Sequence, residues 1–162
     1  MEIALATVLD CPLEAAWRAL RTPRLLRHVA APLVVLEPIE PPALPEAWAP
    51  GDYAVRLRLF GLVPFGRQTI GLELPGPGEP GAEDDPDVRR VRDRGHGDRI
   101  RVWDHRITLR SRSDGRTDYE DRVTIDAGAL TPGVAAFAWV FYRHRQRRWR
   151  ALVRRGFVYD GS

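Results

Sequence analysis

The feature of this sequence that most constrains its fold is a series of segments with alternating polarity, followed by one long helical segment. In residues 53–59, Tyr53 and Leu57 fall on one face and two arginines on the other, which is typical of a half-buried strand. Residues 61–66, with two glycines and a proline, predict a turn, and further segments with strand character are 68–74, 88–94, 100–112 and 117–126. The helical segment spans 131 to about 155. Because such a sheet has one apolar face, we predict that this helix covers it.

Two short helices are expected between the first two strands. Residues 3–9 have the character of a strand. Pro12 is suited to the start of a helix that runs through Leu20, and Thr22 can cap a second helix that ends near Val29. Strand character returns at 33–39, and the prolines that follow it predict an extended loop up to residue 50. This order predicts an α+β fold, with an antiparallel sheet of six to seven strands wrapped around the C-terminal helix.

The length of the chain suits a single domain with its own core, and we interpret residues 1–162 in this way. The segment 75–87 is rich in glycine, proline and acidic residues, which predicts a flexible acidic loop. Too little chain lies on either side of it for two cores, so it is not expected to separate domains.

Composition excludes several classes of site. Cys11 is the only cysteine, so an intrachain disulfide and a Cys-rich zinc site are excluded. All 25 basic residues are arginine, which excludes Schiff-base chemistry and a P-loop lysine. The longest apolar run, Val134–Tyr142, is far shorter than the roughly 20 residues of a membrane span, and the N-terminus lacks a basic leader with an apolar region. We therefore expect a cytoplasmic protein without a transmembrane span.

Several short motifs occur in a defined order along the predicted strands and the final helix. They are Asp93, Gly97, Trp103-Asp104-His105, Gly115-Arg116-Thr117, Asp121-Arg122-Val123 and Phe141-Tyr142-Arg143. In this order the sequence resembles the SRPBCC superfamily of START-like, Bet v 1-like and polyketide-cyclase-like proteins, and within it the bacterial ligand-binding members. It differs at Ile107, where the family often has a second histidine. The resemblance implies a helix-grip fold with a cavity between the sheet and the C-terminal helix.

The candidate site lies on two neighbouring strands. Alternation places Trp103 and His105 on one face of the first strand, and Tyr119 and Asp121 on one face of the second. If both faces point inward, His105 and Asp121 form either a structural pair, a group that orients a ligand, or an acid–base pair. Small helix residues such as Ala138 are expected to leave space for a ligand. The predicted ligand contacts are Tyr53, Leu57, Trp103, His105, Tyr119, Asp121, Ala138 and Phe141, with His105 and Asp121 as the candidate catalytic residues.

These patterns predict a protein that binds a small, largely apolar ligand of the lipid, polyketide or aromatic type, and they favour binding over catalysis. The alternative is a cyclase- or aromatase-like enzyme in which His105 and Asp121 perform acid–base chemistry. The seven arginines of 143–155 leave open an interaction with an anionic surface, although no motif for specific nucleic-acid recognition accompanies them. The apolar first half of the helix predicts burial between the sheet and the two short helices, with contact to a lipid surface or a partner subunit, as in a homodimer, as the alternatives. The second half keeps an inward stripe of Phe141, Arg145, Trp149, Leu152 and Val153. The scattered histidines predict no metal and no cofactor.

Overall fold

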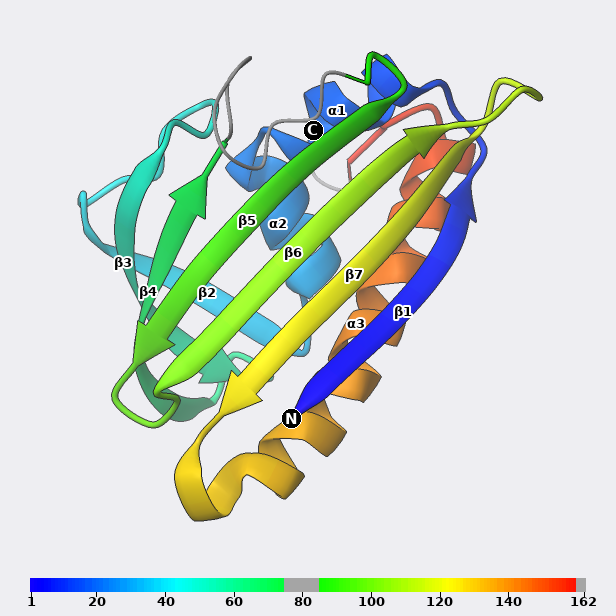
Figure 1. The fold of residues 1–162 in the computed structure, drawn as a ribbon. Helices are drawn as coiled ribbons and strands as arrows, with labels where there is room; N and C mark the ends of the chain where they lie inside the picture. The colour runs from blue at the N-terminus through cyan, green and yellow to red at the C-terminus, as the bar shows by residue number, and fades with distance from the viewer. Residues whose placement is uncertain (75–84, 160–162) are drawn as a thin grey trace.

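The computed structural model describes residues 1–74 and 85–159. Most of the predicted acidic loop, 75–84, lies outside the described residues. The elements are β1 (Glu2–Leu9), α1 (Leu13–Leu20), α2 (Pro23–Ala30), β2 (Val34–Glu40), β3 (Gly51–Leu59), β4 (Val63–Glu73), β5 (Val88–Gly97), β6 (Val102–Ser111), β7 (Thr117–Asp126), the 3-10 turn Gly128–Leu130 and α3 (Thr131–Arg154) (Figure 1). The predicted order of strand, two short helices, further strands and one long helix is confirmed.

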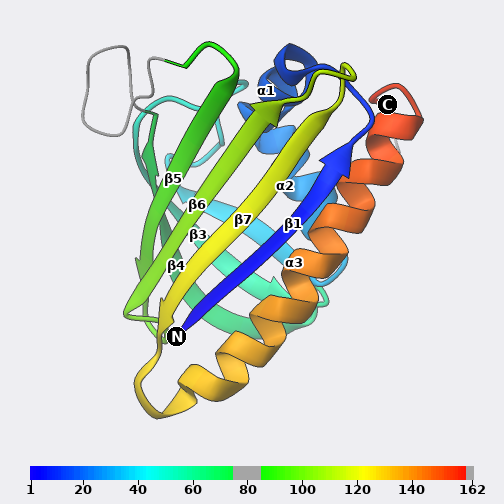
Figure 2. The same ribbon diagram turned by 45° about the vertical axis from the view of Figure 1, so that its right-hand side comes forward.

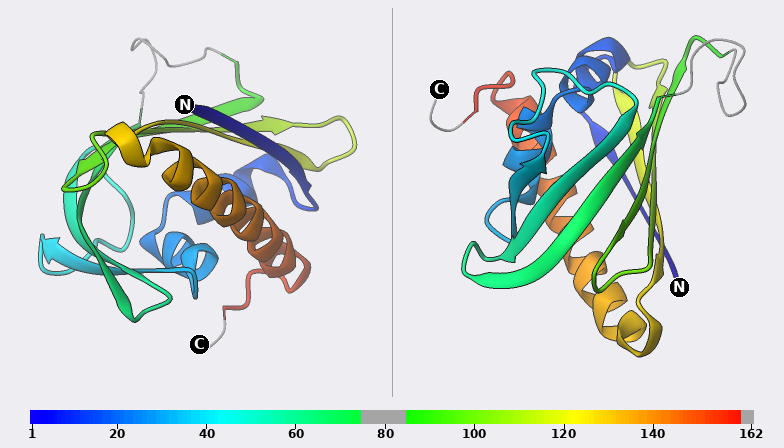
Figure 3. Two further views of the ribbon diagram at one scale, coloured as in Figure 1. Left: turned by 90° about the horizontal axis from the view of Figure 1, so that it is seen from below. Right: turned by 90° about the vertical axis from the view of Figure 1, so that its left-hand side faces the viewer.

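The strands form one seven-stranded antiparallel sheet in the order β1-β7-β6-β5-β4-β3-β2. Strands β2 to β7 form a meander, and β1 joins its far edge beside β7. The sheet curves around α2 and α3, and α3 runs along its concave side near β1 (Figures 2 and 3). Helices therefore cover one face of the sheet, as we predicted from its single apolar face.

One segment predicted as a turn belongs to a strand. Residues 63–66 begin β4, because a register shift against Leu57 and Arg58 absorbs one extra residue. Such a bulge bends the strand and tolerates both Pro64 and the positive φ of Gly66, +113°. The bulge also lets Phe65 line the interior of the sheet.

The cap predicted for the second short helix is present. The Thr22 hydroxyl oxygen accepts a hydrogen bond from the Leu25 N–H at 3.3 Å and donates to the Ala19 carbonyl at 2.8 Å. Replacing Thr22 with alanine is expected to lower the free energy of unfolding by about 1 kcal/mol, because a helix N–H loses its partner. Urea unfolding measures this loss. Thr22→Ser keeps the hydroxyl and serves as the control; an equal loss in both variants would contradict the role of the cap.

The two halves of α3 differ in what covers them. The inward stripe predicted for the second half, Arg145, Trp149 and Leu152, is buried. The expectation that the short helices also bury the first half is wrong, because Trp139 is 47% exposed. The contacts of α2 are made further along, where His144 Nε2 and Arg148 Nε bond carbonyls at the end of α2, both at 2.8 Å. In the part of the chain that the structure describes, no helix is long and apolar enough to cross a membrane.

Candidate functional site: a cavity between the sheet and the long helix

A cavity of about 440 Å³ lies between the concave face of the sheet and the first half of α3. Its wall takes residues from both buried clusters of the core. The wall is mostly apolar. It is lined by Leu26, Ala30, Val34, Leu36, Val55, Leu57, Leu59, Phe65, Gln68, Ile70, Asp93, Arg99, Ile100, Trp103, His105, Leu130, Gly133, Val134, Phe137, Phe141, Tyr142 and Arg145.

Aromatic rings form one side of the cavity. Trp103 of β6 stacks on Tyr142 of α3, with ring centroids 6.1 Å apart. Phe141 meets Tyr142 edge-on at 5.4 Å and stacks on Phe137 at 6.1 Å. These rings come from two elements that are far apart in sequence, and they present apolar surface to any ligand in the cavity.

Behind this wall lies a buried polar network centred on Asp121. On neighbouring strands, His105 and Asp121 are diagonal neighbours on one face, because Asp121 is directly opposite Ile107. The His105 Nε2 to Asp121 Oδ1 distance is 2.8 Å, and the Tyr119 hydroxyl donates to the same oxygen at 2.6 Å. The Gln146 amide of α3 donates to Asp121 Oδ2 at 3.1 Å and to the Leu5 carbonyl of β1 at 3.0 Å. One carboxylate therefore ties β1, β6, β7 and α3 together.

Burial and charge fix the protonation of this network. Burial lowers the pKa of His105, so the ring is neutral and its Nε2–H donates to Asp121. Burial alone would raise the pKa of Asp121, but the hydrogen bond from His105 and the charge of Arg145 outweigh it and lower that pKa. Asp121 therefore remains an ionised acceptor, while His105 faces the cavity as a neutral ring.

Beside His105, one acidic and one basic residue line the inner end of the cavity. Asp93 of β5 lies directly opposite His105 in the sheet, and its Oδ1 accepts a hydrogen bond from the Gly71 N–H at 2.9 Å. Burial raises the pKa of Asp93 to about 7, although this hydrogen bond and Arg145 act to lower it. Arg145 of α3 is 6% exposed. Both residues and His105 also line a smaller adjoining space of about 60 Å³.

The structure separates the eight predicted ligand contacts into two groups. Leu57, Trp103, His105 and Phe141 line the cavity. The other four are buried elsewhere: Tyr53 bonds the Ala49 carbonyl at 3.0 Å, Tyr119 and Asp121 lie behind His105, and Ala138 is enclosed in the core beside the first half of α3.

Ala138 was predicted to leave space for a ligand, but the cavity does not lie beside it. Ala135 and Ala138 pack in the core cluster that contains Val123 and Ile125, whereas the helix face that lines the cavity carries Gly133. Sequence reasoning placed Arg145 only in the inward stripe of the helix and quoted Asp93 only as part of a motif. Neither was predicted as a site residue.

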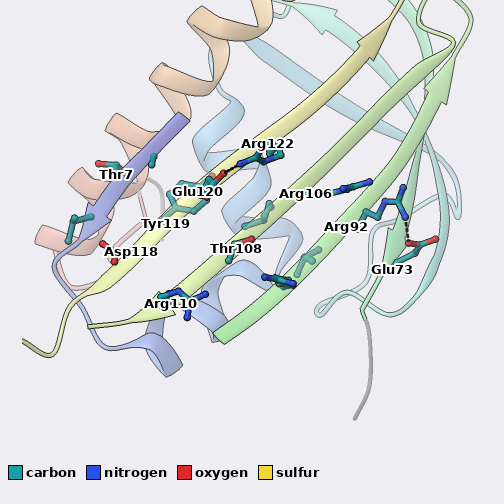
Figure 4. A pocket seen from close by; sticks show the side chains of 15 residues that line it. Thr7, Glu73, Arg92, Arg106, Thr108, Arg110, Asp118, Tyr119, Glu120 and Arg122 are labelled. Atoms are coloured by element: carbon teal, nitrogen blue, oxygen red, sulfur yellow. Dashed lines mark hydrogen bonds and ion pairs between the residues drawn. The ribbon is translucent and has the colours of Figure 1, made fainter. Parts of the chain in front are cut away.

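A second hollow, about 980 Å³, lies over the outer face of β5, β6 and β7 and is ionic in character (Figure 4). Arg92 bonds Asp104 at 2.8 Å, and Arg122 bonds Glu120 at 2.8 Å. Similar ion pairs join Arg106 to Asp104 and Arg110 to Asp85. Because the charges of this face are paired with each other, it has the character of a solvated sheet surface. The apolar cavity on the opposite face is therefore the better candidate for a ligand site. Across residues 1–74 and 85–159, no group of three or more His, Cys, Asp or Glu side chains is placed to hold a metal ion.

No family model matches the sequence, and no curated protein matches it significantly. Solved structures resemble it over nearly their full length. A protein of Chromobacterium violaceum is 20% identical, with a TM-score of 0.63 over 94% of this chain and 96% of that one. An aromatase/cyclase of Streptomyces sp. R1128 is 13% identical, with a TM-score of 0.61 over 100% and 98%. A START superfamily protein of Mycobacterium smegmatis is 11% identical, with a TM-score of 0.61 over 95% and 97%. The chain thus has a helix-grip fold like that of these solved structures, which include an aromatase/cyclase and a START superfamily protein.

Proposed function

We propose that the protein binds a small, largely apolar molecule of the lipid, polyketide or aromatic type between the sheet and α3. The observation that carries this proposal is the cavity of about 440 Å³, mostly apolar, with a few polar groups that converge at one end. Ligand pockets typically enclose about 300–1,000 Å³ with this mixture of side chains. Exposed Leu130 is among its lining residues, so the space opens to solvent and a ligand can enter it.

An uncharged fluorescent probe, N-phenyl-1-naphthylamine, tests this proposal. We expect saturable binding at one site per chain, and Val134→Trp should weaken it by about tenfold or more, because the larger ring enters the cavity. Val140→Trp is the matched control, since Val140 lies on the same helix but is 51% exposed. Absence of saturable binding to the native protein, or equal effects of the two substitutions, would contradict the proposal.

Acid–base catalysis is a second candidate, favoured by the position of His105 on the cavity wall with Asp121 behind it. A neutral ring whose Nε2–H is held by a carboxylate can offer Nδ1 to a substrate proton. Incubation with a poly-β-ketone thioester tests this role, with cyclised product measured by mass spectrometry. Product formed by the native protein, and lost in a folded His105→Gln variant, would favour the enzyme over the carrier. Contact of the exposed arginines of α3 with an anionic surface stays a prediction.

A further inference from the structure

Arg145 is a buried cation on the cavity wall that lacks a direct partner for part of its guanidinium. Its Nε is buried without a hydrogen-bond partner among the described residues. Its guanidinium carbon lies 5.1 and 5.9 Å from the ring centroids of Tyr142 and Phe141, and Tyr119 also interacts with the guanidinium. Within the ranges that the structure describes, no carboxylate forms an ion pair with it. Buried arginines are normally paired, because an unsatisfied charged donor is costly.

The neighbouring carboxyl groups are already engaged. Both oxygens of Asp121 accept hydrogen bonds, from His105, Tyr119 and Gln146. Asp93 uses Oδ1 to accept the bond from the Gly71 N–H. Arg145, Asp93 and His105 converge on the small space of about 60 Å³ that adjoins the main cavity. Arg145 lines this space together with Asp93 and His105, and its guanidinium has donors but no acceptor to offer a group that enters.

We propose that the ligand presents an uncharged carbonyl oxygen to Arg145 in this space, while its apolar part lies against the aromatic wall. The inference rests on the proposed function and narrows the class of ligand to ketones, esters or amides. A carbonyl oxygen accepts from the guanidinium without adding charge.

Charge balance favours the carbonyl over a carboxylate. The charges of Arg145 and Asp121 already offset each other, since each favours the charged form of the other. Although burial acts to lower the pKa of Arg145, Tyr119 and Asp121 raise it, so the guanidinium stays charged. A ligand carboxylate would add a second buried negative charge beside Asp93, which is costly without a further cation.

Three naphthalenes of nearly equal shape test the inference by displacement of N-phenyl-1-naphthylamine. They are 2-acetylnaphthalene, 2-isopropenylnaphthalene, which replaces the carbonyl oxygen by a CH₂ group, and 2-naphthoate. The native protein should bind the ketone about tenfold or more tightly than the alkene, since a hydrogen bond to a charged group is lost in the alkene. Arg145→Met should abolish this preference. Arg147→Met, a change at an exposed arginine of the same helix, should preserve it.

The outcomes separate this inference from the proposed function. If the probe binds and the native protein does not distinguish ketone from alkene, the carbonyl inference fails and the cavity remains a ligand site. If neither the probe nor any naphthalene binds, the proposed function itself fails. Tighter binding of 2-naphthoate than of the ketone would overturn the inference in favour of an anionic head group.

A spectroscopic measurement on the native protein does not depend on the folding of the Arg145 variant. The infrared C=O stretch of ¹³C-labelled 2-acetylnaphthalene should move to lower wavenumber on binding than in an alkane solvent, because a charged donor polarises the carbonyl. A band that stays at its position in alkane would overturn the inference.

Discussion

Replacing Asp121 with alanine is expected to lower the free energy of unfolding by about 3–5 kcal/mol, because each buried donor left without its acceptor costs about 1–3 kcal/mol. The loss is large because three donors depend on this carboxylate. His105, Tyr119 and the Gln146 amide would remain buried without their acceptor, and Arg145 would lose the negative charge that offsets it. Urea unfolding of the native protein and of the variant at pH 7 measures the change. Equal m-values would show that the two proteins expose the same amount of surface on unfolding.

Asp118→Ala provides the matched control on the same strand. Asp118 pairs with Arg112 at 2.9 Å, but its side chain is 47% exposed, so its removal should cost about 0–1 kcal/mol. Equal losses in the two variants would show that the buried network contributes no more than a surface ion pair. A folded Asp121→Asn variant with intermediate stability would assign the remaining effect to charge, because asparagine keeps the shape of the side chain.

The fold could be predicted because its main signals are local. The alternation of polar and apolar residues predicts which side chains of β6 and β7 lie on the same face. His105 and Asp121 do lie on one face of the sheet, within hydrogen-bond distance of each other. The ends of α3 were predicted within one residue, because Thr131-Pro132 and Gly156 are strong boundary signals. The start of β4 was missed because Pro64 and Gly66 suggest a turn, and only pairing with β3 reveals the bulge.

The polar end of the cavity depends on register and on long-range packing, which alternation alone does not give. Asp93 faces the cavity because β5 pairs with β6 so that Asp93 lies opposite His105, and that register is set by the short connection after Gly97. Arg145 lies at the helical spacing of Phe141 and Trp149, yet arginine is so common on surfaces that spacing alone suggests only packing. Arg145 can be recognised as a site residue only from the residues that surround it in the folded protein.

The second large effect is expected in the pH dependence of stability, through Asp93. An aspartate in the unfolded chain has a pKa of about 3.9, whereas burial raises the pKa of Asp93 to about 7 in the folded protein. Between these values the unfolded chain releases a proton that the folded protein retains. The contribution of Asp93 to stability is therefore largest at low pH and falls as the pH rises from about 4 to about 7, by at most about 4 kcal/mol.

Asp93→Asn isolates this contribution, because asparagine keeps an oxygen that can accept from the Gly71 N–H but does not titrate. The groups around it stay the same in both proteins: His105 and Asp104 from β6, and Arg145 from α3. His105 acts in the opposite direction, since its lowered pKa removes stability as the pH falls, but this effect cancels when the variant is compared with the native protein.

Urea unfolding of both proteins at several pH values between 4 and 8 measures the difference in stability. As the pH rises, the free energy of unfolding of the variant should increase relative to that of the native protein. This increase should level off above about pH 7. Asp10→Asn, at an exposed site beyond β1, controls for the general effect of removing one negative charge. A difference that does not change with pH would mean that Asp93 is ionised throughout the range. The buried Arg145 would then have a permanent anionic neighbour in Asp93.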